Sequence, residues 1–175
     1  IQITSGSMNV YDNQYTGNNS VWQGGGLWVE HSGGTMNVYR NRFIINTAGE
    51  TGAGANLFLD YGTAKIYHNI FNRNRSVLAG GGINFSTNTG SINIFNNTLF
   101  SNTASDGGDV NVYFDNSSAR SFFINNILFN STEPALSYSG QQSVAARYCD
   151  IKGGAGQPWF GTGCIDRYPY FRDTS

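Results

Sequence analysis

An acid, a base and an imidazole recur at equal spacing along the chain, at Asp12, Arg40 and His68. If this spacing makes one turn of a repeat, neighbouring turns would bring Asp12 next to Arg40 and Arg40 next to His68. A carboxylate, a guanidinium and a titratable imidazole in a row could carry out acid–base chemistry or hold an anion. The alternative is a solvated corner with a weak ion pair, because a turn position accepts most polar residues.

A second acidic pair, Asp60 and Asp115, falls in a column of short polar residues completed by Ser32 and Asn88. Two repeats separate these carboxylates, which corresponds to about 9 to 10 Å at the usual strand spacing. That separation lies near the upper limit for the carboxylate pair of an inverting glycosidase. A polysaccharide lyase or glycoside hydrolase with an atypical carboxylate site is therefore one hypothesis. Turns commonly contain Asp and Asn, which is the simpler explanation.

Four aromatic residues share a further position of the repeat, and we expect them to point outward in one column. They are Tyr11, Tyr39, Tyr67 and Phe95, with Asn37 and Asn93 beside them. Sugar rings pack their apolar faces on aromatic rings while their hydroxyls bond to amides, so this face is a candidate glycan-binding site. The alternative is an aromatic ladder that only stabilises a parallel sheet through cross-strand packing.

The end of the chain contains two cysteines and two acids of interest. Cys149 and Cys164 flank a glycine-rich loop. We expect a disulfide, which would contribute about 3 kcal/mol for a loop of that length and would indicate an exported protein. A metal or redox pair is the alternative, although there is no C-x-x-C motif. Asp150 and Asp166 could bind calcium, or serve only in capping and turns, and we expect no other cofactor.

These columns require an element that returns to the same place once per repeat. An asparagine marks the period, with spacings of 28, 28, 28 and 29, at Asn13, Asn41, Asn69, Asn97 and Asn126. The residues before it alternate with period two and favour β-branched and aromatic types, which predicts strands. A β unit repeated in register predicts a parallel β-helix with ladders of identical side chains. Asn fits such a ladder because it tolerates left-handed turns and its amide both donates and accepts.

We therefore predict an all-β fold, a right-handed parallel β-helix of about six coils. The coils should span 1–144, and 145–175 should form a capping segment. Glycine clusters such as Gly24-Gly25-Gly26 should allow positive φ and close stacking of turns. Trp22, Trp28 and Trp159 are assigned to packing or cover. The predicted core is Val10, Tyr15, Val38, Phe43, Leu57, Ile66, Phe71, Ile83, Phe85, Ile94, Leu99 and Val112.

Two sets of motifs resemble known families. The interior pairs Gly25-Gly26-Leu27 and Gly81-Gly82-Ile83 with Phe43-Ile44-Ile45-Asn46 and Phe71-Asn72-Arg73-Asn74, which resembles the repeats of polymorphic outer-membrane proteins. The tail contains Asp150-Ile151-Lys152-Gly153-Gly154, Gly161-Thr162-Gly163, Ile165-Asp166 and Pro169-Tyr170-Phe171, which resembles choice-of-anchor β-helix surface proteins of the pectate-lyase-like superfamily. The resemblance implies a right-handed parallel β-helix. The chain lacks the N-T-D, D-D and G-H set of polygalacturonases and an obvious calcium-binding Asp cluster with Arg, as in pectate lyases.

The composition of the chain limits the classes of partner that it could bind. The 175 residues carry a formal net charge of -1, with 12% charged residues and 23 glycines. No basic stripe is present, so nucleic acid is a poor partner, and no apolar run is long enough for direct membrane insertion. Low charge suits a solenoid whose polar groups are Asn, Ser and Thr.

The first functional hypothesis is an exported, non-catalytic surface domain, adhesin-like or glycan-binding, located outside the cell, in the periplasm or on the cell surface. Its partner would be a polysaccharide or surface glycan. The alternatives are the polysaccharide-degrading enzyme and a structural spacer of a larger β-helix protein. End-to-end self-association would fit an exposed sheet edge.

Overall fold

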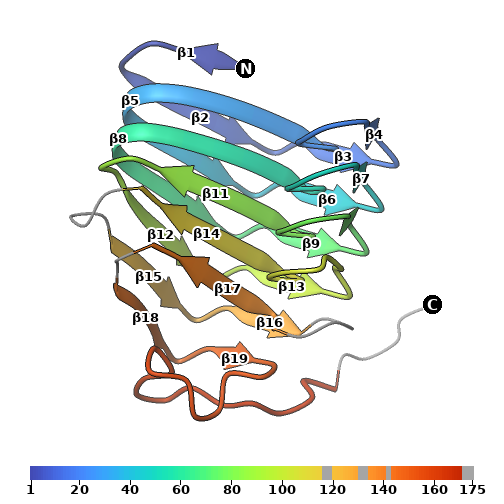
Figure 1. Ribbon diagram of the computed structural model, residues 1–175. Coiled ribbons are helices and arrows are strands. Elements are labelled where there is room, and N and C mark those ends of the chain that lie inside the picture. The colour runs from blue at the N-terminus through green and yellow to red at the C-terminus, as the bar shows by residue number, and fades with distance from the viewer. Residues whose placement is uncertain (116–119, 130–133, 141–142, 171–175) are drawn as a thin grey trace.

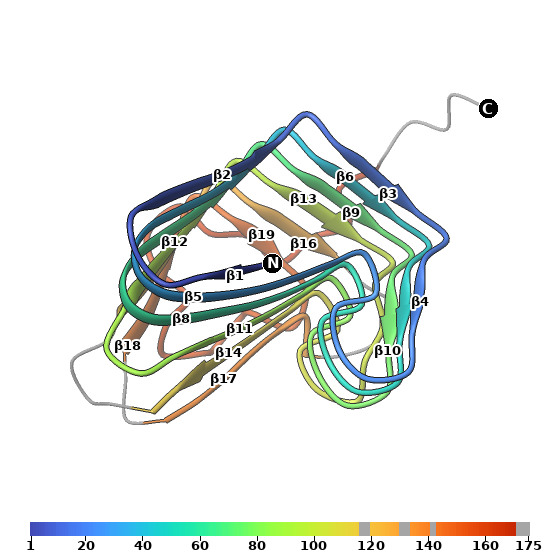
Figure 2. The same ribbon diagram turned by 90° about the horizontal axis from the view of Figure 1, so that it is seen from above.

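The computed structural model describes residues 1–115, 120–129, 134–140 and 143–170, so Phe171 of the tail motif lies outside the described residues. These residues form a parallel β-solenoid of about five turns, and helices are absent from them (Figure 1). Seen from above, successive coils repeat nearly the same outline (Figure 2). The predicted fold class is confirmed, with about five turns where the sequence predicted about six.

The strands fall into three parallel sheets of ten, six and three strands. The ten-stranded sheet covers two faces because its long strands β5 (Leu27–Tyr39) and β8 (Ala55–Tyr67) pass around a corner. One face adds β1 (Gln2–Ile3), β11 (Ile83–Thr87), β14 (Val110–Phe114) and β17 (Leu136–Ser139), and the other adds β2 (Ser7–Tyr11), β12 (Ser91–Phe95), β15 (Arg120–Ile124) and β18 (Ser143–Arg147).

The two smaller sheets close each coil. The six-stranded sheet contains β3 (Gln14–Thr16), β6 (Arg42–Ile44), β9 (Ile70–Asn72), β13 (Thr98–Phe100), β16 (Ile127–Phe129) and β19 (Asp150–Ile151). The three-stranded sheet contains β4 (Asn19–Ser20), β7 (Thr47–Ala48) and β10 (Arg75–Ser76). After β19 the chain leaves the coil and crosses the end of the solenoid (Figure 1).

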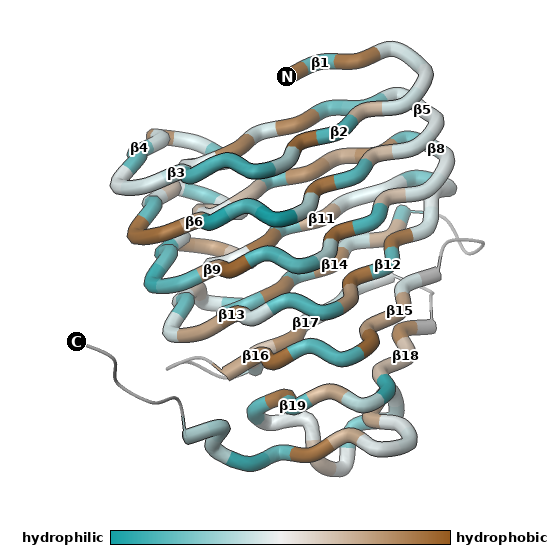
Figure 3. Tube along the Cα trace, turned by 180° about the vertical axis from the view of Figure 1, so that it is seen from behind, coloured by the Kyte–Doolittle hydropathy of each residue, from teal (hydrophilic) through white to brown (hydrophobic). Residues whose placement is uncertain are grey.

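Strand register places equivalent residues of successive repeats above one another. Val10 pairs with Val38, and Val38 pairs with Ile66. The predicted core is buried throughout except at Tyr15, which is only partly buried because it lies on the first coil. Apolar and polar stretches recur at the same place from coil to coil (Figure 3).

The asparagine ladder is confirmed, and its geometry repeats from rung to rung. The backbone N–H of Asn41 donates to Asn69 Oδ1 over 2.9 Å, and Asn41 Nδ2 donates to the same oxygen over 3.1 Å. Asn69 repeats both bonds with Asn97. The same pattern joins Asn18, Asn46, Asn74 and Asn102 into a second ladder at the next corner. Buried amides are thereby satisfied within each ladder.

The residue in the left-handed conformation at each corner is the one before the ladder asparagine, whereas the sequence predicted the asparagine itself. Asp12, Arg40 and His68 have φ of 56°, 54° and 54°, and each precedes a ladder asparagine. The second corner likewise bends at Gly17, Ile45, Arg73 and Ser101. This bend leaves the following asparagine free to turn inward, where its side chain meets the next rung. The conformational tolerance of Asn is therefore not why the ladder uses it; its paired donor and acceptor are.

Candidate functional site

The charged column forms one ion pair, between Asp12 and Arg40. Arg40 Nη2 lies 2.6 Å from Asp12 Oδ2, and both side chains are about half exposed, at 54%. The hydrogen bond from Arg40, together with its charge, holds the pKa of Asp12 below its usual value. His68 instead contacts Asn96 at 3.2 Å and the edge of the Tyr67 ring. The column is thus a solvated corner with an exposed ion pair, whose contribution to stability is small.

The carboxylates of Asp60 and Asp115 are separated by an intervening rung. Asn88 occupies that rung and donates from Nδ2 to Asp60 Oδ1 over 2.6 Å. Asp115 is exposed, and its backbone N–H donates to the carbonyl of Thr87. The pair therefore has an amide between its members, where an inverting glycosidase would hold a water and the glycosidic bond.

The aromatic column is assembled as predicted, but its rings cover one another. Ring centroids lie 5.1 Å apart between Tyr11 and Tyr39, 4.9 Å between Tyr39 and Tyr67, and 4.8 Å between Tyr67 and Phe95. The planes are within 6° of parallel. Neighbouring rings therefore occupy both faces of the inner rings, Tyr39 and Tyr67, where a sugar would otherwise stack. Beside it Asn37 Nδ2 donates to Asn9 Oδ1 over 2.9 Å, and Asn93 pairs with Lys65.

The acids of the tail bond to backbone N–H groups. Asp150 Oδ1 accepts from Arg167 N over 3.1 Å, and Asp166 Oδ2 accepts from Ala155 N over 3.2 Å. Burial raises the pKa of Asp150, and the nearby charge of Asp166 adds to this effect. Within the part of the chain that the structure describes, no three His, Cys, Asp or Glu side chains gather where they could hold a metal ion. These contacts support capping of the tail loop.

The cysteines are both free thiols in the structure, and they lie on neighbouring paired segments. Cys149 is buried and Cys164 is partly buried against the core. The predicted disulfide stays a prediction.

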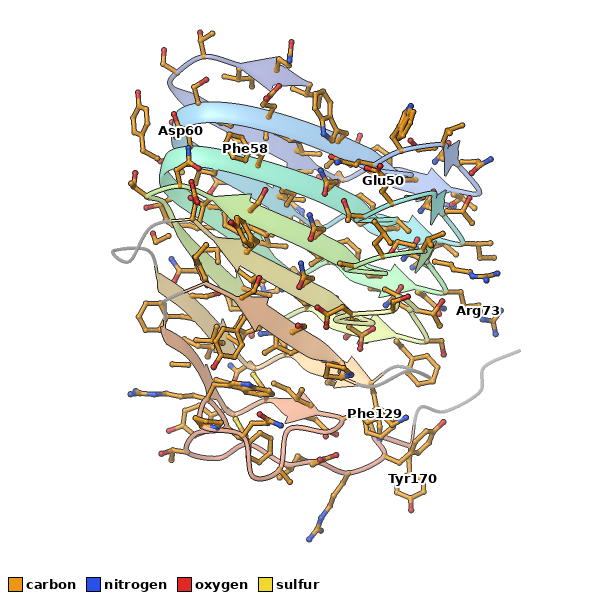
Figure 4. The ribbon with its side chains drawn as sticks, viewed as in Figure 1. Glu50, Phe58, Asp60, Arg73, Phe129 and Tyr170 are labelled. Atoms are coloured by element: carbon orange, nitrogen blue, oxygen red, sulfur yellow. The ribbon has the colours of Figure 1, made fainter. Side chains whose placement is uncertain are left out.

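A groove on the outer surface of β5, β8, β11 and β14 was not predicted. It has a volume of about 380 Å³ and takes residues from four successive coils. In Figure 4 this sheet faces the viewer, with Phe58 on β8 and Glu50 in the loop that precedes β8. The lining residues are Gln23, Trp28, Glu30, Thr51, Asn56, Phe58, Asn84, Ser86 and Tyr113.

A chain of amides runs along this groove. Asn111 Nδ2 donates to Asn84 Oδ1 over 2.8 Å, and Asn84 Nδ2 donates to Asn56 Oδ1 over 2.7 Å. Asn56 Nδ2 then donates to Gln23 Oε1 over 3.1 Å, and Gln23 Nε2 donates to the Glu50 carboxylate over 3.2 Å. The four amides are therefore aligned toward one negative charge, so each bond can strengthen the next. An amide nitrogen has two N–H groups, and these bonds use one from each.

The aromatic residues of the groove differ from the stacked column. Trp28 pairs across strands with Asn56, and Tyr113 pairs with Ser86, so each ring has a polar neighbour on that side. Their side chains are 39% and 47% exposed. Of the three tryptophans assigned to packing or cover, Trp159 is buried, whereas Trp28 and Trp22 are exposed, Trp22 at 68%. Aromatic surface next to oriented amides matches what a sugar requires.

A regular spacing was the sequence signal for this groove. Trp28, Asn56, Asn84 and Asn111 recur along the chain at nearly the same period as the ladder asparagines. The spacing shows a column but not whether it lies on a flat or a hollowed surface. That depends on the neighbouring loops containing Gln23, Glu50 and Thr51.

Comparisons with known proteins add no relative, because no family model, no curated protein and no solved structure matches the chain. Among the described residues, no helix is long and apolar enough to cross a membrane.

Proposed function

We propose that this β-solenoid is a non-catalytic glycan-binding domain and that its ligand occupies the groove lined by Trp28, Asn56, Asn84 and Tyr113. The single observation that carries the proposal is the aligned amide chain beside exposed aromatic side chains. The sugar's apolar ring face would pack on Trp28 or Tyr113, and its hydroxyls would accept from the unused amide N–H groups. The resemblance to β-helix surface proteins supports placement of the domain outside the cell.

The groove also favours one orientation of an extended ligand, along the axis of the solenoid. Its residues belong to four consecutive coils, and coils repeat every 4.8 Å or so along the axis. An extended oligosaccharide lying along that axis would span about three such intervals between the rung of Trp28 and that of Tyr113. We therefore expect affinity to rise with chain length up to three or four sugar units and then level off.

The lining favours binding over cleavage. Glu30 is the carboxylate among the lining residues, and its Oε2 accepts from Gln2 Nε2 over 2.6 Å. Hydrolysis by the usual mechanism requires two carboxylates flanking the scissile bond. The polysaccharide-degrading alternative would therefore depend on groups outside the groove.

The test is titration calorimetry with neutral and N-acetylated oligosaccharides of two to six units, after a glycan array has selected the series. Trp28→Ala should weaken binding by about tenfold or more, since loss of an aromatic contact is worth roughly 1.4 kcal/mol or more. Trp22→Ala is the matched control, because Trp22 is more exposed and lies outside the groove lining. Equal affinity in Trp28→Ala and the wild type, or no binding to any saccharide, would overturn the proposal. Release of shortened sugars, lost on Asp60→Asn or Asp115→Asn, would select the enzyme instead.

A further inference from the structure

The thiol of Cys149 occupies the place of an asparagine at the end of the first ladder. Asn126 directs its backbone N–H at Cys149 Sγ over 3.4 Å and its Nδ2 at the same atom over 3.9 Å. Earlier rungs point these two groups at the next asparagine Oδ1. Cys149 Sγ in turn donates to the carbonyl of Arg147, two residues earlier, over 3.3 Å. Asn97 Nδ2 makes the corresponding bond to Phe95.

The capping segment brings Cys164 beside this thiol. Asp150 and Ile165 form a parallel bridge, and Ile165 N donates to Cys149 O over 2.8 Å. This register sets Cys149 and Cys164 at neighbouring positions of adjacent extended segments. Such segments lie about 4.8 Å apart, within the Cα separation of roughly 4.4 to 6.8 Å that a disulfide spans.

The capping segment that carries Cys164 contacts the last coil at few places. Trp159 is buried at the coil's end, and Phe160 bridges to Ala146. A covalent bond at Cys164 would fix this cover on the ladder's terminal rung. Opening of the cap would otherwise expose the end of the core.

We propose that Cys149 and Cys164 form a cross-link site, at which a small-molecule disulfide or a protein disulfide oxidant ties the cap to the last rung of the solenoid. The thiolate of Cys164 attacks one sulfur of the oxidant and releases one thiolate. Cys149 then loses its proton to solvent and attacks the sulfur of Cys164, releasing the second thiolate. Two protein thiols lose two protons and two electrons, and the oxidant disulfide is reduced to two thiols.

The environment sets the order of these steps. Burial raises the pKa of Cys149 to about 11, so this thiol is protonated at neutral pH. Cys164 is more accessible and reacts first. Oxidation removes the S–H group of Cys149 that donates to Arg147 O. The sulfur of Cys149 remains in position to accept the hydrogen bond from Asn126.

The experiment compares the purified protein kept in a thiol reductant with the same protein exposed to glutathione disulfide. Intact mass under non-reducing conditions should fall by two hydrogens after oxidation, and peptide mapping should join Cys149 to Cys164. The melting temperature should rise by roughly 5 to 10 °C, as expected for a loop of this size. A protein that keeps both thiols titratable, or in which they pair only between molecules, overturns the proposal.

Two variants separate the cross-link from the ladder. Cys164→Ser removes the cross-link, keeps the Cys149 rung and should abolish the response of the melting temperature to oxidant. Cys149→Asn restores an amide at the rung, so its melting temperature should match or exceed that of the reduced wild type and should not change with oxidant. An oxidant-induced rise that persists in Cys164→Ser would overturn the proposal without bearing on glycan binding.

Discussion

The buried amide of Asn102 donates to Oδ1 of Asp109 over 2.8 Å, seven residues further along the chain. Asp109 stands where earlier coils place glycine, because Ile83 N donates to Asp109 O just as Ala55 N donates to Gly82 O. In the described residues a carboxylate thus accepts from the last amide of the second ladder, and the Cys149 thiol accepts from the last amide of the first. Both acceptors are side chains other than asparagine.

The first prediction concerns the charge of Asp109. Its carboxyl is fully buried and Oδ2 has no hydrogen-bond partner, and burial raises its pKa well above the usual 3.8. A raised pKa means that the folded state binds the proton more tightly. The contribution of Asp109 to stability is therefore highest below pH 3.8 and falls as pH rises toward its folded-state pKa. Asp109→Asn should remove this fall and stabilise the protein at pH 8 by about 1 kcal/mol or more.

Urea unfolding of both proteins between pH 4 and pH 8 or so measures this effect. An Asp109→Asn protein that is less stable than the wild type at the upper end of the range would contradict it.

The second prediction concerns the interior of the first ladder. Asn69→Ala removes the amide that bonds to Val38 O, Tyr67 O and Asn97. It also leaves the backbone N–H of Asn41 without an acceptor, while Asn41 Nδ2 keeps its bonds to Val10 O and Tyr39 O. We expect a loss of about 3 kcal/mol or more, because buried unpaired donors are costly. Asn13→Ala, on the exposed first coil, should cost about 1 kcal/mol or less. Equal losses in chemical denaturation would show that the ladder does not depend on burial.

The third prediction concerns the strained corner at Ile45. This β-branched residue has φ of 55° and is half exposed, while the equivalent corner on the preceding coil is Gly17. Asn adopts this conformation at a lower energy, so Ile45→Asn should stabilise the protein by about 1 kcal/mol. Ile70→Asn is the control, since Ile70 lies in β9, is similarly exposed and has ordinary strand geometry. That variant should be neutral or destabilising, and the same gain from both would rule out relief of backbone strain as the cause.

The fourth prediction separates the stacked column from the groove. Tyr39→Ala removes a ring stacked between Tyr11 and Tyr67 and should lower the free energy of unfolding by about 1 to 2 kcal/mol. Saccharide affinity should be unchanged, because Tyr39 does not line the groove. Calorimetric titration and urea unfolding of the same preparation measure both quantities. A loss of sugar affinity in Tyr39→Ala would contradict this prediction and would indicate that the sugar binds to the stacked aromatic column.

Much of the architecture could be predicted from the sequence, because residues one repeat apart occupy equivalent positions on successive coils of a solenoid. Asn41, Asn69 and Asn97 recur with the period of the repeat and lie on adjacent rungs, so the period alone predicted their contact. The stacking of Tyr39 on Tyr67 followed for the same reason. The left-handed residue was placed one position late, because a pattern of side chains does not show which backbone angle makes the corner.

The candidate site was less accessible to sequence reasoning. Asp60 and Asp115 were correctly expected in one column, but the hydrogen bond from Asn88 to Asp60 depends on side-chain orientation. The groove at Trp28 and Tyr113 depends on how a neighbouring loop rises beside the sheet. Both features depend on side-chain orientation and on the course of a loop as well as on the repeat period. The spacing of residues in the sequence predicts neither orientation nor loop course.

The sequence by itself determined the parallel coil, its interior and the asparagine ladders, since one repeated register fixes all three. Only the tertiary structure decided how the ladders end and where a ligand could lie. Asp109 meets Asn102, and Cys149 meets Asn126, at separations shorter than one repeat, so neither contact follows the period. Cys149 lies where the coils give way to the capping segment, and the donors of Asn126 must find an acceptor there because buried polar groups need partners.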